Sequence, residues 1–123
     1  MPHLTLEYTN NITQKIDTKA VFNQLHRVLE TVGGVRIGNC KSRARVSEDF
    51  YIAEGKATDA FVHLDLRLLE GRSLALKREL GEHVLQVLNN HFTQAQGALD
   101  LQITVSIIDI ERATYFKLPE GTL

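Results

Sequence analysis

The chain has 123 residues, 43% of them hydrophobic, and its 14 lysines and arginines nearly balance its 15 aspartates and glutamates. This length predicts one domain over residues 1–123, and the balanced charge argues against a general nucleic-acid-binding surface. No signal peptide is evident and no apolar run approaches about 18 residues, so we expect a cytoplasmic protein without a membrane partner. The five histidines lack the companion spacings of a metal site, and we expect no metal.

The chain begins with Met-Pro, and an apolar alternation starts at the proline. Pro2, Leu4, Leu6 and Tyr8 share one parity, which predicts a strand over residues 2–8. A small second residue usually permits removal of the methionine, which leaves a secondary amine on this strand. An α-amino group has a pKa of about 7.7–8.0, and burial or nearby arginines lower it further, so such an amine suits a general base. Met-Pro starts also occur without catalytic meaning, so this interpretation needs support from other residues.

Two helices and three more strands follow. Each element shows the periodicity of its type, and each helix begins at a cap residue. The polar stretch from Ser47 to Asp59 separates two strands and predicts a hairpin around residues 50–52. The expected elements are a strand at 2–8, a helix from the Asp17 cap to about Val32, strands at 40–46 and 60–69, a helix from the Ser73 cap to Phe92, and a strand at 101–107 before a C-terminal tail.

The two halves of the chain resemble each other. His3-Leu4-Thr5-Leu6 and His63-Leu64-Asp65-Leu66 begin equivalent strands, which predicts two β-α-β units at about 1–55 and 56–110. Right-handed crossovers place both helices on one face of a four-stranded sheet, an α+β fold. The chain has no third layer for the opposite face. We expect that face to be partly apolar and buried against copies of the chain in a closed ring.

The proline on the first strand and the duplicated β-α-β unit occur together with Ala60-Phe61-Val62-His63-Leu64 and Gly71-Arg72-Ser73. In combination they resemble the tautomerase superfamily and, within it, the 5-carboxymethyl-2-hydroxymuconate isomerases of homoprotocatechuate degradation. The resemblance runs from Pro2 through the second helix and is weak beyond about residue 97. It implies a homotrimer with its site around the prolyl nitrogen near a subunit boundary, and no metal or organic cofactor. The implied substrate is a small dienol with several carboxylates, whose proton the proline transfers.

Three cationic residues are candidates for binding those carboxylates. Arg72 directly precedes a helix start, where its guanidinium and the free amides of the first turn can hold one carboxylate together; the alternative is a solvated loop arginine. Lys41 and Arg43 project from one face of their strand. Where the family pattern has Ile-Arg-Ser-Arg, this chain has Cys40-Lys41-Ser42-Arg43, so a bidentate arginine is replaced by a lysine that acts as a point charge.

Four further residues lie near these elements without an assigned catalytic role. We expect His3, His63, Phe50 and Tyr51 to serve packing or sheet polarity rather than chemistry. The leading hypothesis is therefore an isomerase that converts an enol to a ketone. A hydratase or decarboxylase of the same superfamily stays open, since it uses a cationic prolyl nitrogen. A trimeric protein that binds small acids without turnover also stays open.

Overall fold

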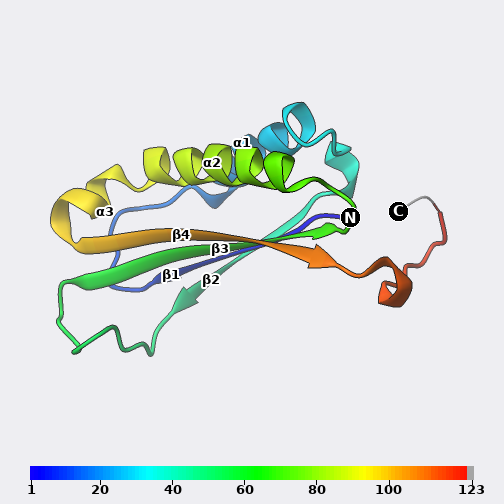
Figure 1. Cartoon of the computed structure of the whole chain (residues 1–123). Helices are drawn as coiled ribbons and strands as arrows, with labels where there is room; N and C mark the ends of the chain where they lie inside the picture. The colour runs from blue at the N-terminus through cyan, green and yellow to red at the C-terminus, as the bar shows by residue number, and fades with distance from the viewer. Residues whose placement is uncertain (122–123) are drawn as a thin grey trace.

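A computed structural model describes residues 1–121 of the chain. Two long helices cover one face of a four-stranded sheet, as Figure 1 shows, so the expected α+β architecture is confirmed. The elements are β1 (His3–Thr9), α1 (Thr18–Thr31), η1 (Ile37–Asn39), β2 (Lys41–Ser47), β3 (Asp59–Leu69), α2 (Leu74–His91), α3 (Thr93–Ala98), β4 (Asp100–Ile110) and η2 (Arg112–Thr114).

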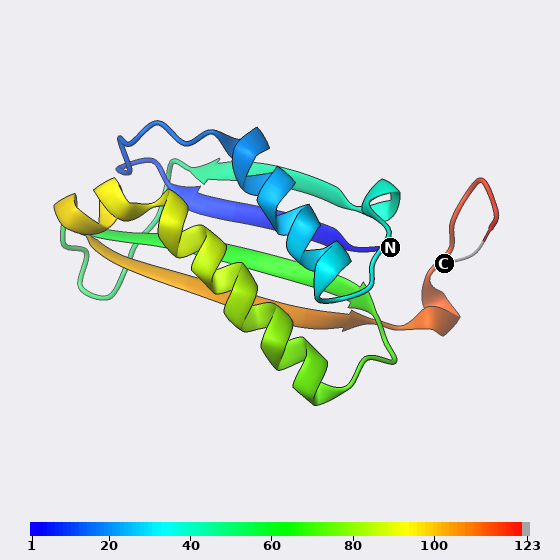
Figure 2. The same cartoon turned by 90° about the horizontal axis from the view of Figure 1, so that it is seen from above.

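The strand order is β2-β1-β3-β4, with the two halves of the chain joined at the centre of the sheet. β1 and β2 run parallel, as do β3 and β4, because a helix connects the strands of each pair. β1 and β3 pair antiparallel, with Leu4 opposite Leu66. Figure 2 shows α1 and α2 lying side by side across the sheet. Each half is thus one β-α-β unit, the second of which carries the additional short helix α3.

The core lies between the sheet and the helices. On β1 and β3 the alternate residues Leu4, Leu6, Leu64 and Leu66 are 0% exposed, and the buried stripes of α1 and α2 pack over them. The cap residues expected from the sequence are present. Asp17 accepts a hydrogen bond from the backbone N–H of Ala20, and Ser73 accepts one from Leu76.

The structure corrects the sequence prediction in the segment that precedes β3. The predicted hairpin around residues 50–52 is absent, and residues 48–58 form bends and turns. Tyr51 lies over Gly55, whose φ of +83° suits glycine, and Phe50 packs edge-to-face on Phe61. This segment is therefore shaped by aromatic contacts and a left-handed turn rather than by strand pairing.

One further difference concerns the end of α2. Residues 93–98 form α3, which has no side-chain N-cap hydrogen bond and therefore no local start signal. The open face of the sheet is mostly polar and charged with a few apolar residues, which agrees with the partly apolar face expected from the sequence. Among the residues that share it are His3, Thr5, Glu7, Arg43, Arg45, His63, Asp65, Arg67, Thr104 and Ser106, with Phe61 and Ile108 as apolar members. Contact between copies through this face would have to satisfy polar groups.

No helix within residues 1–121 is long and apolar enough to cross a membrane. The cytoplasmic location expected from the sequence stays a prediction.

Candidate active site

Four strand ends meet at one edge of the sheet, beside the start of the chain. β2 is parallel to β1, so Lys41 at its start lies opposite His3. β3 is antiparallel to β1, so its last residues arrive at the same edge, where Arg67 lies opposite His3. β4 is parallel to β3 and brings Ile110 there as well. Figures 1 and 2 show the amino terminus at this edge, with the arrowheads of β3 and β4 next to it.

The first two residues are buried at this edge. Met1 is only 8% exposed, and the carbonyl of Pro2 accepts a hydrogen bond of 3.1 Å from the backbone N–H of Lys41. With Met1 attached, the nitrogen of Pro2 is a tertiary amide without basicity, and the terminal amine of Met1 stands one residue before the amine that processing would create. Removal of Met1 would leave its recess vacant at the nitrogen of Pro2.

Positive charges surround the terminal amine. Burial lowers the pKa of the Met1 amine, and the charges of Arg72, Lys41 and Arg112 lower it further, while Cys40 acts in the opposite direction. Two of the cations predicted from the sequence, Arg72 and Lys41, therefore lie near enough to act on the chain start. An amine in this environment favours its neutral form, which is the form of a base.

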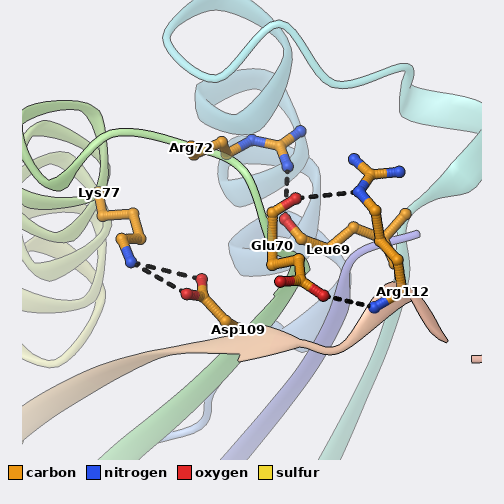
Figure 3. A network of polar contacts seen from close by, with 6 residues as sticks. All are labelled: Leu69, Glu70, Arg72, Lys77, Asp109 and Arg112. Carbon is orange, nitrogen blue, oxygen red and sulfur yellow. Dashed lines mark hydrogen bonds and ion pairs between the residues drawn. The ribbon is translucent and has the colours of Figure 1, made fainter. Parts of the chain in front are cut away.

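Arg72 is half-buried, and its guanidinium turns back onto the end of β3. Its Nη1 donates to the carbonyl of Leu69 at 3.2 Å. Figure 3 shows the side chain extending toward Arg112 and away from the helix that carries Lys77. The amide of Leu76 in the first turn of that helix is already bonded to Ser73. Binding of one carboxylate by both the guanidinium and the helix amides thus stays a prediction. In this structure the guanidinium contacts the end of β3 instead.

Arg43 is separated from this group and belongs to a hydrogen-bonded row on the open face. Its Nη2 donates to Nδ1 of His3 at 3.2 Å. Because an arginine only donates, Nδ1 is the acceptor, and the proton of the neutral ring is on Nε2, which donates to the hydroxyl of Tyr115 at 2.9 Å. Burial lowers the pKa of His3, as do Arg43 and Lys41, so the neutral ring is favoured. His3 therefore links the first strand to the C-terminal tail.

Of the remaining residues singled out by the sequence, His63 and Tyr51 lie away from the chain start, whereas Cys40 lies near enough to act on the Met1 amine. His63 bonds through Nε2 to Asp65 at 2.8 Å and through Nδ1 to Thr104 at 2.7 Å, within the sheet. Tyr51 is 78% exposed. Burial raises the pKa of the Cys40 thiol, which favours the unreactive thiol over the thiolate. Within residues 1–121 no cluster of three or more His, Cys, Asp or Glu side chains could hold a metal ion.

The sequence interpretation missed three residues at this edge: Glu70, Arg112 and Tyr115. Arg112 donates from its backbone N–H to Oε2 of Glu70 at 2.8 Å and from Nε to the carbonyl of Glu70 at 3.1 Å. Figure 3 shows this pair beside Arg72. These residues could have been found from their place after the strands. Glu70 follows β3, and Arg112 and Tyr115 follow β4, which pairs with β3 so that Leu69 lies opposite Ile110.

A comparison with protein families places the chain. A model of the 5-carboxymethyl-2-hydroxymuconate isomerase family matches residues 2–120. The chain belongs to this family. The membership identifies it as an isomerase with a tautomerase fold. The match extends through β4 and η2 into the tail, and the weaker resemblance expected beyond about residue 97 stays a prediction.

Two family members and one relative in fold agree with the assignment. The 5-carboxymethyl-2-hydroxymuconate Delta-isomerase of Escherichia coli is 26% identical over 117 residues, which cover 95% of this chain and 93% of that protein. A solved structure of a 5-carboxymethyl-2-hydroxymuconate isomerase from Deinococcus radiodurans R1 is 31% identical with a TM-score of 0.86, and covers 94% of this chain and 87% of that one. A fused 4-OT symmetric trimer shares the fold alone, at 15% identity and a TM-score of 0.69, over 98% and 94% of the two chains.

Proposed function

We propose that this isomerase converts the enol 5-carboxymethyl-2-hydroxymuconate, or a closely related unsaturated polycarboxylate, into its conjugated ketone in aromatic acid degradation. Pro2, freed by removal of Met1, is the catalytic acid-base group. The observation that carries the proposal is the convergence of the chain start with Arg72 and Lys41 at one edge of the sheet. A base that can be neutral beside fixed positive charges is what proton transfer on a polyanion requires.

The proposed reaction moves one proton and changes no oxidation state. The nitrogen of Pro2 removes the proton of the 2-hydroxyl group, the electrons of the O–H bond and the diene shift, and the proton is delivered to the distal carbon. An O–H bond breaks and a C–H bond forms. Arg72 and Lys41 bind carboxylates and stabilise the enolate charge that develops between the two steps.

Arg43 is proposed as a third anion-binding residue. It shares a strand face with Lys41, but its guanidinium already donates to His3. A substrate carboxylate would have to join that contact or replace it. Its terminal nitrogens have the fork geometry that Lys41 lacks, which favours Arg43 as the bidentate group on β2.

We further propose that the protein is a homotrimer, because its own helices leave one face of the sheet uncovered and a fold relative forms a symmetric trimer. Light scattering coupled to gel filtration should give the mass of three 13.9 kDa chains. A monomeric mass at micromolar concentration would contradict this part of the proposal.

The role of Pro2 is tested by removing it and by blocking it. Intact-mass spectrometry should show loss of Met1, and Pro2→Ala should lower kcat by about 10²- to 10⁴-fold in an ultraviolet assay of dienol disappearance. A form with an uncleaved extension before Pro2 should fold and be inactive, because the nitrogen is then an amide. Pro119→Ala, which changes the chain's other proline in the exposed tail, is the matched control and should retain activity.

The pH dependence separates this proposal from a hydratase or decarboxylase that needs a cationic proline. Activity through the free amine rises as the pH passes the amine pKa, whereas activity through the ammonium falls. The burial and positive charges that lower the pKa of the Met1 amine, one residue before the nitrogen of Pro2, support the free-amine form. Full activity of Pro2→Ala, or a rate that falls with increasing pH over the amine titration, would reject the proposed role.

A further inference from the structure

An arginine outside the predicted site lies beside it. Arg112 begins η2 two residues after the last residue of β4, and β4 ends at the sheet edge where the chain starts. Figure 3 shows the guanidinium groups of Arg112 and Arg72 on either side of the end of β3, each bonded to a neighbouring carbonyl, that of Glu70 or of Leu69. Two like charges at the same strand end repel unless an anion joins them.

Arg112 is held at both ends of its short helix. At the start, Glu70 accepts the backbone N–H of Arg112 at 2.8 Å and, through its carbonyl, Nε at 3.1 Å. Just beyond the end, the hydroxyl of Tyr115 accepts a hydrogen bond from His3 at 2.9 Å, and the two rings pack edge-to-face. His3 is the residue after Pro2, so these contacts tie η2 to the start of β1, and the charge of Arg112 acts on the Met1 amine there.

The guanidinium of Arg112 keeps donors available. Of its five N–H groups, one on Nε is used by the carbonyl of Glu70, while the carboxylate of Glu70 bonds the backbone instead. No ion pair joins either Arg72 or Arg112 to a carboxylate within residues 1–121. The terminal nitrogens of Arg112 can therefore donate hydrogen bonds to a carboxylate from outside the chain.

We infer that Arg112 binds a substrate carboxylate remote from the reacting hydroxyl, next to the carboxylate bound by Arg72, and that Glu70 is the residue that positions it. The inference rests on the proposed function for the identity of the substrate. Arg112 is then a specificity-determining residue, because it strengthens the binding of substrates that carry an additional carboxylate and takes no part in proton transfer. Its effect is uniform binding, which appears in KM rather than kcat.

Kinetics with the tricarboxylate dienol test the inference. Arg112→Gln should raise KM by about tenfold to a hundredfold and leave kcat within about threefold, as expected for a lost charge-assisted hydrogen bond that acts equally in ground and transition states. The matched control is Arg78→Gln, which removes an exposed arginine of α2 and should leave KM unchanged. With two dienols, each lacking one of the remote carboxylates, the defect should disappear for one of them. An unchanged KM, or a defect that persists with both, would overturn the inference.

The positioning role of Glu70 has its own test. Glu70→Ala removes the acceptor of the Arg112 amide and should raise KM in the same direction, while Glu70→Gln retains an acceptor oxygen and should restore most of the affinity. A purely structural role would lower the melting temperature of both variants without separating their KM values. Equal KM values for Ala and Gln would overturn the positioning role.

A binding measurement separates failure of this inference from failure of the proposed function. Propane-1,2,3-tricarboxylate is a simple probe that needs no turnover, and calorimetric titration should give a dissociation constant at least tenfold weaker for Arg112→Gln than for the wild type and for Arg78→Gln. This result would stand even if Pro2→Ala remained active. Equal affinity of all three proteins would refute the role of Arg112, whatever the reaction proves to be.

Discussion

Leu66→Ala tests whether the sheet and the helices pack as described. Leu66 on β3 lies directly opposite Leu4 on β1, and both are 0% exposed. The substitution removes three carbons, worth roughly 2.4 kcal/mol of transfer at about 0.8 kcal/mol each. The unfilled space adds to this, and buried leucines truncated in this way lose about 3–5 kcal/mol of unfolding free energy.

This loss converts into a measurable change of melting temperature. For 123 residues, an unfolding entropy of about 2.1 cal/mol/K per residue means that 1 kcal/mol corresponds to roughly 4 °C. Leu66→Ala should therefore melt about 12–20 °C below the wild type. Circular dichroism and urea unfolding, at one fixed protomer concentration, measure the change, because association would make stability depend on concentration.

A matched control and a double variant complete the experiment. Leu74→Ala makes the same chemical change at a residue that is 63% exposed and should stay within about 0.5 kcal/mol of the wild type. Leu4→Ala combined with Leu66→Ala should cost less than the sum of the single variants, because the two cavities merge. A cost below about 1 kcal/mol for Leu66→Ala, with an unchanged denaturant slope, would refute the packing described here.

Two further predictions concern pH and helix capping. Burial and Arg43 lower the pKa of His3 in the folded state, so the unfolded chain, whose histidine has a pKa of about 6.5, takes up the proton first. The unfolding free energy should be largest above pH 6.5 and fall as the pH drops through the folded pKa; His3→Gln should flatten this fall in urea titrations, and an unchanged slope would count against the effect. Ser73→Ala removes the acceptor of the Leu76 amide and should cost about 0.5–2 kcal/mol, whereas Ser73→Asp keeps an acceptor and should cost less. Equal unfolding midpoints for both variants would contradict the cap.

Much of the local structure could be predicted because its signals lie within a few residues of each other. The alternation of Leu4 with Leu6 specifies which face of β1 is buried, and a serine at position 73 followed by helical periodicity specifies where α2 begins. The absent hairpin and the additional helix α3 show where such signals end. Tyr51 over Gly55 is a side-chain contact across a turn, and no periodic pattern encodes it.

The candidate site divides in the same way. The chemistry of Pro2 and the charges of Lys41 and Arg72 are properties of residue types and of their place in a motif, so the amino-acid sequence alone was enough to select them. The cluster around the chain start is different, because it depends on the strand order β2-β1-β3-β4 and on the opposite directions of β1 and β3. Pairing across the whole sheet brings the end of β4 to the start of β1. Only the tertiary structure therefore revealed Arg112, held by Glu70, which follows β3 and stands 42 positions earlier in the chain.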